Sequence, residues 1–166
     1  MKSSFSKYIE QYSADLTRLC ISLCGNNADA EDLFQDTWLK ALRGFDTYDG
    51  ERPFDKWLFA ICVNAFKNKT ALFFNKKRYH FSSDEEMQSF FDSLPDTASE
   101  AHDRYYELHS AVCELPRKQR AALVLYYFRE HSVSEVAEIL GVPEGTVKSR
   151  LCAARRQIKR RLEHEQ

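Results

Sequence analysis

The sequence predicts an all-α protein with two small helical domains joined by an acidic, flexible linker. Three observations lead to this expectation. Apolar side chains recur at three- and four-residue steps in several long segments, which is the spacing of one face of a helix. Runs in which Val, Ile or Thr alternate with polar residues, the pattern of a strand, are few. Between the helical segments, residues 84–103 carry seven acidic side chains and no lysine or arginine.

The N-terminal part contains three expected helices. The first buries an apolar stripe between residues 5 and 23 that includes Ile9. The second buries a stripe between residues 30 and 45 that includes Leu42, and acidic residues stand in its first turn, where the helix dipole favours them. A loop with the sequence "FDTYDGERP" leads to a third helix over residues 53–74, which is apolar around most of its circumference.

The acidic stretch separates parts of unequal charge. Residues 1–75 carry 9 basic and 10 acidic side chains, whereas residues 108–166 carry 11 and 7, so the formal net charge of −1 conceals a basic C-terminal part. We expect a first domain over residues 1–78, an acidic linker over 79–103 and a second domain over 104–166. Composition alone leaves open whether the linker is only a solvated spacer.

Helical patterns resume after the linker, at about residues 102–114 and, beyond Pro116, at about 117–129. Ser132 and Glu135 form an S-x-x-E capping box, which opens a short helix that ends at Gly141. Pro143 suits the first turn of the last helix. A short helix, a tight turn with glycine and a longer helix form a helix-turn-helix, whose second helix enters the major groove of DNA.

The last helix separates its apolar and basic residues. Its apolar residues fall on one stripe: Val147, Leu151, Ala154, Ile158 and Leu162. Residues 143–162 carry seven basic side chains and one acidic side chain, a net charge of +6, and most of the cations lie opposite the stripe. Ser149 and Cys152 stand among these cations, and such small side chains let a helix approach base edges. A solvated cationic surface at a chain end is the plain alternative.

This basic face supplies the candidate DNA contacts. Lys148, Ser149 and Cys152 lie near the start of the helix and are expected to reach base edges. The four remaining candidates are expected to meet phosphates: Arg150, Arg155, Arg156 and Lys159. One helix that engages so few phosphates binds weakly by itself, so a larger assembly is implied.

Other features of the chain restrict the class of protein. The N-terminus lacks the apolar core of a signal peptide and no apolar run reaches membrane-spanning length, so we expect no membrane insertion. The five cysteines form no CxxC pair and fit reduced thiols in a cytoplasmic protein. Cys20 and Cys24 share a helix face, where a buried apolar role is favoured over a metal site. Motifs of catalysis are lacking, so the sequence predicts neither an enzyme nor a cofactor.

Three segments resemble conserved regions of bacterial sigma factors, the subunits that direct RNA polymerase to promoters. The segment "SVSEVAEILGVPEGTVKSRLCAARRQIKRRL" (132–162) is similar to region 4, which reads the −35 element. "DAEDLFQDTWLKAL" (29–42) resembles region 2.2, and "FDKWLFAICVNAFKN" (54–68) resembles regions 2.3 and 2.4. These motifs in a short chain resemble the extracytoplasmic-function (ECF, group 4) subfamily of the sigma-70 family. The resemblance implies a promoter-specific initiation factor that binds core RNA polymerase and opens DNA at the −10 element.

The second helix carries a candidate docking site. Leu39 lies in the middle of a polar face, and an apolar residue in that setting indicates a contact with a partner, although single exposed leucines are common. The resemblance implies that region 2.2 docks on the clamp helices of the largest polymerase subunit. The candidate docking residues are Asp32, Gln35, Asp36, Leu39 and Arg43.

The resemblance implies that the third helix and the loop before it bind the −10 element and capture a flipped base. The candidate residues are Lys56, Trp57, Asn64, Lys67 and Asn68. Core packing is the competing role for the aromatic residues of this segment. The chain departs from the family pattern in two places: "KTALFF" follows Asn68 instead of an arginine-rich run, and Cys152 stands where relatives often carry a bulkier residue.

The resemblance implies further partners, namely the flap of the second-largest polymerase subunit and an anti-sigma factor, with a stress- or envelope-responsive role. The residues themselves leave other classes of protein open. One is a stand-alone regulator that uses its first domain to dimerise or to sense a ligand. Another is a helical adaptor whose basic tail is incidental, and an enzyme is a more distant alternative.

Overall fold

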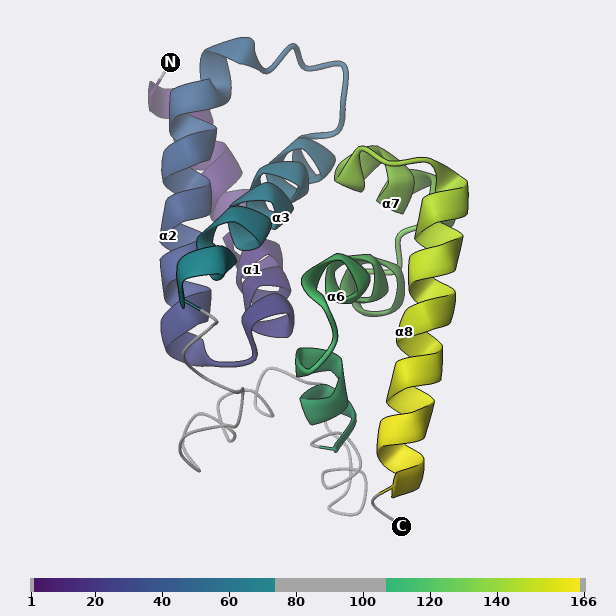
Figure 1. The fold of residues 1–166 in the computed structure, drawn as a ribbon. Helices are drawn as coiled ribbons and strands as arrows, with labels where there is room; N and C mark the ends of the chain where they lie inside the picture. Colours follow the sequence, from purple (N-terminus) through teal and green to yellow (C-terminus); the bar gives the residue numbers. More distant parts are fainter. Residues whose placement is uncertain (1, 74–106, 165–166) are drawn as a thin grey trace.

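The computed structural model describes residues 2–73 and 107–164, and every regular element within these two ranges is a helix (Figure 1). The prediction of an all-α fold with two helical domains is therefore confirmed. The expected acidic linker over residues 79–103 lies outside the described residues, as do both expected domain boundaries. Within the two described ranges, no helix combines the length and the apolar composition that a membrane span requires.

The first domain consists of an antiparallel helical hairpin crossed by a third helix (Figure 1). Its elements are α1 (Lys2–Cys24), α2 (Asn27–Gly44), the short 3₁₀ turn η1 (Phe45–Thr47) and α3 (Phe54–Phe73). Gly25 links α1 to α2 with a φ of 78°, a conformation that favours glycine. The Asn26 side chain then caps α2 by accepting a hydrogen bond of 2.9 Å from the backbone N–H of Asp29.

Aromatic side chains fix the start of α3 against α1 and α2. The ring of Phe54 stacks on Tyr8 with 4.0 Å between ring centres and on Trp38 with 6.5 Å. The ring centre of Trp57 lies 5.0 Å from that of Tyr48, which stands in the preceding loop. Each such pair contributes about 0.5–1.5 kcal/mol beyond the burial of its apolar area. The aromatic packing therefore holds the loop and the first turn of α3 in one position.

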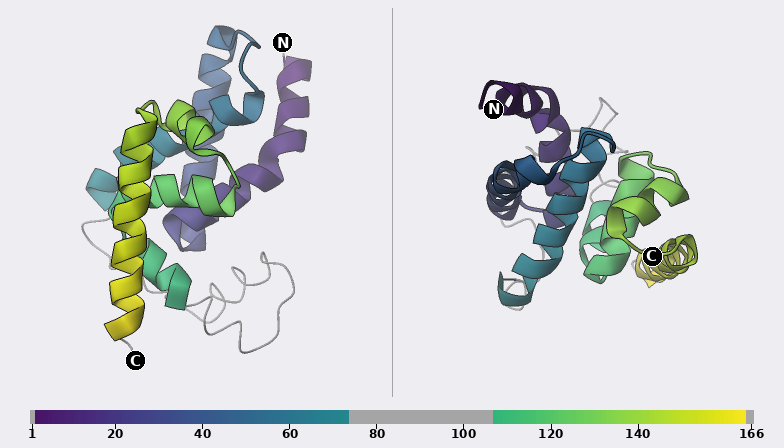
Figure 2. Two further views of the ribbon diagram at one scale, coloured as in Figure 1. Left: turned by 90° about the vertical axis from the view of Figure 1, so that its right-hand side faces the viewer. Right: turned by 90° about the horizontal axis from the view of Figure 1, so that it is seen from above.

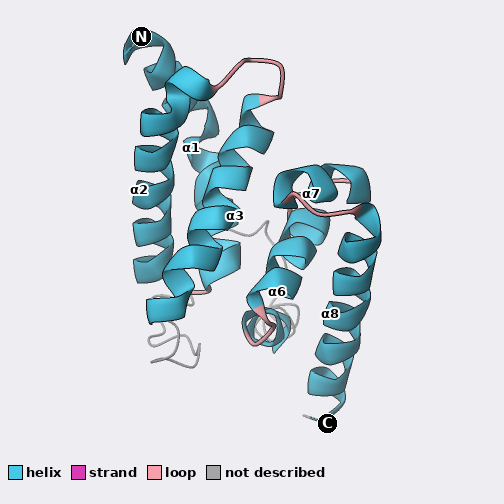
Figure 3. Ribbon diagram, turned by 45° about the horizontal axis from the view of Figure 1, so that its top comes forward, coloured by secondary structure: helices cyan, strands magenta, loops and turns pink. Residues whose placement is uncertain are grey.

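The second domain places a helix-turn-helix on a short helical support (Figure 3). A helix over 107–113 leads to α6 (Arg117–Leu123), the π-helical turn η3 (Val124–Phe128), α7 (Val133–Leu140) and α8 (Glu144–His164). The predicted capping box is confirmed, because the Ser132 hydroxyl accepts from the Glu135 N–H at 3.1 Å and the Glu135 carboxylate accepts from the Ser132 N–H at 2.9 Å. Gly141 ends α7 in the left-handed conformation, with a φ of 65°.

The structure differs from the sequence prediction at the end of α6. The periodicity predicts one helix over 117–129, but the α-helical part ends at Leu123 and the chain continues as the π-helical turn η3. The Arg129 N–H donates to the Val124 carbonyl at 3.1 Å, which is the five-residue step of a π-helix. Glu130 follows with a φ of 55°, so the chain leaves the helix there.

Two apolar residues that the periodicity assigned to buried faces are exposed instead. Ile9 of α1 is 37% exposed and Leu42 of α2 is 53% exposed. The contacts of α2 with α1 and α3 are made by the stripe that includes Leu33, Trp38 and Ala41. Leu42 lies just past the edge of this stripe, so the predicted apolar face was one residue too wide.

The two domains pack against each other and share one hydrophobic core. The helix α3 contacts both α6 and α7, and η3 contacts α1 (Figure 2). Arg120 of α6 is only 5% exposed and donates a hydrogen bond of 2.9 Å to the Leu23 carbonyl near the end of α1. The same guanidinium lies 5.7 Å from the centre of the Phe66 ring of α3. This one side chain therefore contacts two helices of the first domain.

The turn between α1 and α2 fits closely against the second domain. A Cβ atom added to Gly25 would lie 2.5 Å from the Cys113 sulfur and 3.5 Å from Cε1 of His109. Burial, together with the nearby charge of Arg120, lowers the pKa of His109 to about 4. The imidazole is therefore neutral at pH 7 and packs at this contact as an uncharged ring.

We expect Gly25→Ala to destabilise the protein more than Gly50→Ala. The two glycines have φ values of 78° and 77°, so both substitutions carry a backbone cost of about 1–2 kcal/mol. A methyl group at Gly25 must also displace Cys113, whereas nothing lies within 4 Å of the added atom at Gly50. The free energy of unfolding, measured by urea denaturation, should fall by about 1–3 kcal/mol more for Gly25→Ala. Equal losses would contradict the close packing of this turn against the second domain.

Candidate nucleic-acid interface

The helix α8 presents its basic residues because its opposite side is held in the core. Val147, Leu151 and Ala154 have exposures of 0%, 2% and 0% and face α6 and α7. These contacts confirm the predicted apolar stripe at its first three positions. The capped α7 and the left-handed Gly141 fix the turn before α8, so the basic face has a set orientation relative to the second domain.

The outward face of α8 begins with small side chains between cations. Lys148, Ser149, Cys152 and Arg156 are all exposed. The Ser149 hydroxyl donates to the Gly145 carbonyl at 3.0 Å, so this side chain lies back against its own helix. The Arg156 guanidinium approaches the Cys152 sulfur at 3.9 Å, and Lys148 stands one turn earlier. Short side chains at the beginning of α8 therefore lie between positively charged ones. This arrangement lets the helix backbone approach base edges in a DNA groove.

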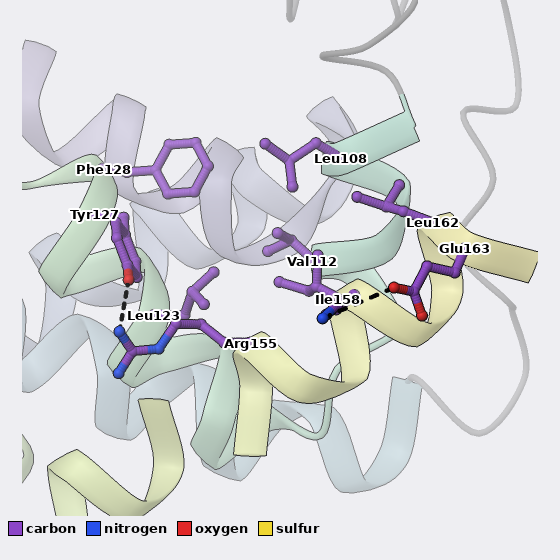
Figure 4. Close-up of a pocket in the computed structure, with 10 residues that line it drawn as sticks. Leu108, Val112, Leu123, Tyr127, Phe128, Arg155, Ile158, Leu162 and Glu163 are labelled. Carbon is purple, nitrogen blue, oxygen red and sulfur yellow. Dashed lines mark hydrogen bonds and ion pairs between the residues drawn. The ribbon is translucent and has the colours of Figure 1, made fainter. Parts of the chain in front are cut away.

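Two of the predicted phosphate contacts, Arg155 and Lys159, lie at the border between this face and an apolar groove (Figure 4). Arg155 donates to the Leu151 carbonyl and to the Tyr127 hydroxyl, both at 3.2 Å. Lys159 pairs with Glu163 at 3.9 Å. The groove has a volume of about 530 Å³. Its apolar lining consists of Leu108, Val112, Leu123, Tyr127, Phe128, Ile158 and Leu162.

The structure separates Arg150 from the other predicted cations of α8. Its side chain is half-buried on the flank that faces α3, where its charge acts on Lys67. Arg161 lies on the same flank of α8 and donates to Glu114 at 2.9 and 3.3 Å. The cations of α8 therefore belong to two groups, an exposed group that begins with Lys148 and a second group directed toward the rest of the protein.

The candidate −10 residues on α3 also divide into two groups. Asn64 and Asn68 are exposed, one turn apart on the same face. Trp57 is half-buried and packs on Phe54 at 5.4 Å between ring centres, so packing accounts for part of its role. The two lysines of the set, Lys56 and Lys67, are in contact with the second domain.

Lys56 forms ion pairs with the helix-turn-helix. Its ammonium lies 3.3 Å from Glu135 and 3.6 Å from Glu138, and the side chain is 19% exposed. Burial lowers the pKa of Lys56, but the two carboxylates outweigh burial and the pKa is raised. The pKa of Glu135 is lowered, first by its hydrogen bond with the Ser132 backbone and then by Lys56. Both partners are therefore ionised at neutral pH.

Positive charges act on Lys67, whereas carboxylates surround Lys56. Burial lowers the pKa of Lys67, and the positive charges of Arg150 and Lys118 lower it further. The backbone carbonyl of Lys67 accepts a hydrogen bond of 3.2 Å from Arg117. Cations from both domains thus gather at this end of α3, and a polyanion bound there would relieve their mutual repulsion.

The candidate docking residues lie on α2, on the side of the first domain away from α7 and α8 (Figures 1 and 2). Leu39 is 52% exposed among the exposed polar side chains of Asp32, Gln35 and Arg43. Asp36 is half-buried and pairs with Lys40 at 2.9 Å.

Leu42 is a further exposed apolar residue beside the candidate docking residues, although the sequence periodicity places it on the buried face. It lies three residues from Leu39, which places both side chains on one face of α2. The i, i+3 spacing was the available signal. Arg52 was also missed. Arg52 stands in the loop before α3, and its guanidinium lies 3.7 Å from the carboxylate of Glu138 in α7, an approach between domains that no local sequence pattern predicts.

Two family models match the chain, and together they cover both domains. The model described as Sigma-70 region 2 matches residues 8–71, and the model described as Sigma-70, region 4 matches residues 105–158. The ECF RNA polymerase sigma factor SigW of Bacillus subtilis is 28% identical, over 97% of this chain and 90% of that protein. The ECF RNA polymerase sigma factor SigL of Mycobacterium tuberculosis is 33% identical, over 90% of this chain and 84% of that protein.

Solved structures resemble the whole arrangement. The sigma factor RpoE in complex with the anti-sigma factor NepR from Bartonella quintana has a TM-score of 0.70 and 25% identity, over 98% of this chain and 99% of that one. CnrH in complex with the cytosolic domain of CnrY has a TM-score of 0.71 and 22% identity, over 100% of this chain and 92% of that one. The second likeness concerns the fold alone.

Proposed function

We propose that this chain, which belongs to the ECF sigma factors of the sigma-70 family, directs core RNA polymerase to −10 and −35 promoter elements and opens the DNA at −10. The observation that carries the proposal is the exposed basic face of α8, presented by a capped helix-turn-helix. Family members are initiation factors, and their site of action would be the cytoplasm, where core polymerase works.

The helix α8 would read the −35 element in the major groove. Lys148 and the low side chains of Ser149 and Cys152 would approach base edges, because they stand exposed near the start of the helix. Phosphate contacts are assigned to the cations around them: Arg150, Arg155, Arg156 and Lys159. Of these, Arg156 is exposed on the outward face, whereas Arg150 is half-buried and its charge acts on Lys67 of the first domain.

The helix α3 would bind the −10 element. Asn64 and Asn68 supply amide groups that can hydrogen-bond to the edges of an unpaired base, and Trp57 supplies a ring beside them. Lys56 and Lys67 would hold the strand by its phosphates. Amide and aromatic groups together can compensate for the stacking that a base loses when it leaves the duplex.

Core polymerase would dock on α2 and on the second domain. The exposed pair Leu39 and Leu42 forms an apolar centre with a polar rim, the composition of a protein interface. We assign the clamp-helix contact to this surface, with Asp32, Gln35, Asp36 and Arg43 as its rim. The flap contact is assigned to the second domain, where the groove in Figure 4 exposes Tyr127 and Phe128. An anti-sigma factor is proposed as a further partner, by likeness to RpoE bound to NepR.

Run-off transcription tests this function directly. Purified chain and core polymerase, incubated with a library of promoters, should give transcripts with defined start sites that neither component gives alone. A stand-alone regulator would instead protect a palindromic site without polymerase. A helical adaptor would retain its function when Lys148, Arg155 and Arg156 are replaced by alanine. The absence of any defined start site across the library would reject the proposal.

Leu39→Asp is expected to weaken association with core polymerase by at least about 30-fold, because it places a charge at the centre of an apolar contact. Leu39 is half-exposed, so circular dichroism and thermal unfolding should stay unchanged. The matched control is Ile9→Asp, the same kind of change at an exposed apolar residue of α1. Affinity is measured by fluorescence anisotropy of the labelled chain. If both variants bind polymerase as the wild type does, α2 is not the docking surface.

Lys148→Ala is expected to lower run-off transcription from a −35-dependent promoter by about tenfold, the loss of one base or phosphate contact. Transcription from a template with a pre-opened −10 bubble should fall much less, because α3 makes that contact. Lys7→Ala, which removes an exposed cation from α1, serves as the control for net charge. Equal losses on the two templates would remove Lys148 from the −35 contact.

A further inference from the structure

We propose that the free chain closes its own −10-reading helix against the second domain, with Glu135 and Glu138 of α7 occupying the place of DNA phosphates at Lys56. The proposal rests on the proposed function for the identity of the −10 helix. The two domains would therefore have to move apart in a separate step before the chain recognises a promoter. Glu135 and Glu138 are called the acidic pair below.

The closed arrangement cannot contact both promoter elements at once. The two elements are named for positions about 25 base pairs apart, which corresponds to about 85 Å of duplex. In the structure, α3 packs directly on α7, which is joined to α8 by one tight turn. The 21 residues of α8 span only about 32 Å. The two DNA-reading helices must therefore separate before the chain can bind a complete promoter.

The acidic pair blocks Lys56 by charge and by position. Both carboxylates lie within 3.6 Å of its ammonium, and Glu138 also lies 3.7 Å from Arg52 at the edge of the −10 loop. A phosphate that approached Lys56 would meet two negative charges in the site. Because most nucleic-acid affinity comes from phosphate contacts, masking this cation weakens binding even though Asn64 and Asn68 stay exposed.

Contacts elsewhere in the interface stabilise the same closed position. Arg129 of the second domain pairs with Asp15 of α1 at 2.8 Å and lies 5.6 Å from the centre of the Phe59 ring. His131 packs edge-on against the same ring at 5.8 Å. At the other end of α3, Lys67 faces the cations Arg150 and Lys118, which oppose closure. DNA would compete with the acidic pair for Lys56, which favours opening, and the repulsion at the other end lowers the cost of that opening.

The docking surface on α2 remains available in the closed chain. Leu39 and Leu42 are 52% and 53% exposed on α2, a helix that lies on the side of the first domain away from α7 and α8. The chain can therefore bind the clamp helices before it opens. A second contact of polymerase with the second domain would then separate the domains, which gives the order docking, opening and promoter binding.

A zero-length carbodiimide reagent tests closure in the free, full-length chain. It joins a lysine and a carboxylate in direct contact as an amide, with loss of water. We expect peptide mass spectrometry to find Lys56 joined to Glu135 or Glu138 in the free chain. The cross-link should disappear in the open complex with core polymerase and promoter DNA. The Lys40–Asp36 pair within α2, at 2.9 Å, is the internal reference for the free chain.

A pair of matched variants tests whether the acidic pair controls access to DNA. The probe is a single-stranded oligonucleotide with the −10 region of a promoter selected by run-off transcription. Its apparent affinity for the free chain scales with the fraction of open molecules. Glu138→Gln should raise this affinity about threefold by weakening exposed ion pairs. Glu144→Gln removes the same charge from the first turn of α8 and should change it much less.

The outcomes separate closure from promoter function. Absence of the Lys56 cross-link from the free chain, or equal yield in the open complex, overturns the closed form even if run-off transcription succeeds. Equal affinities of Glu138→Gln and Glu144→Gln overturn the role of the acidic pair. If the cross-link forms but no promoter supports run-off transcription, closure stands and the sigma-factor function is rejected.

Discussion

The guanidinium of Arg120 lies inside the protein, where a cation is stable only if nearby groups replace the water it has lost. It donates to the carbonyls of Cys113, Leu115 and Leu23, the last from the other domain. Leu23 and Cys113 lie at the C-terminal ends of their helices, where the helix dipole concentrates negative partial charge. Packing of the two domains completes this set of acceptors. The position of α6 against α1 and α3 follows from it, and so do the positions of α7 and α8.

The charged groups around this buried centre have a different role from the centre itself. The ion pair of Lys56 with Glu135 is partly exposed, and exposed ion pairs contribute little to stability. The buried contacts around Phe59 and Phe66 therefore determine where the second domain sits. The charges determine how readily it leaves, because salt and polyanions act on them and leave the apolar contacts unchanged. Stability and responsiveness thus reside in different residues of one interface.

Much of the local structure could be predicted from the sequence, because its signals are local. The capping box at Ser132, the turn at Gly141 and the buried stripe of α8 each depend on residues a few positions apart. Periodicity also placed Leu39 on an exposed face. It misplaced Leu42, because the width of a buried face depends on which helices pack against it. The charge of Arg150 acts on Lys67 in α3 of the other domain, and no spacing within α8 predicts that approach.

Among the candidate −10 residues, the lysines are covered by the second domain while Asn64 and Asn68 are exposed, so bases and backbone would be bound by separate groups. In the proposed function, Asn64 and Asn68 would make short-range hydrogen bonds to a base, and such bonds contribute to specificity only after a strand is held nearby. Lys56 would supply part of that hold, and in this structure its charge is already compensated by the carboxylates of Glu135 and Glu138. A strand that touched only the amides would have few phosphate contacts and would dissociate quickly. Under the proposed closure, a small contact between α3 and α7 would therefore be sufficient to prevent stable binding without burying the amides.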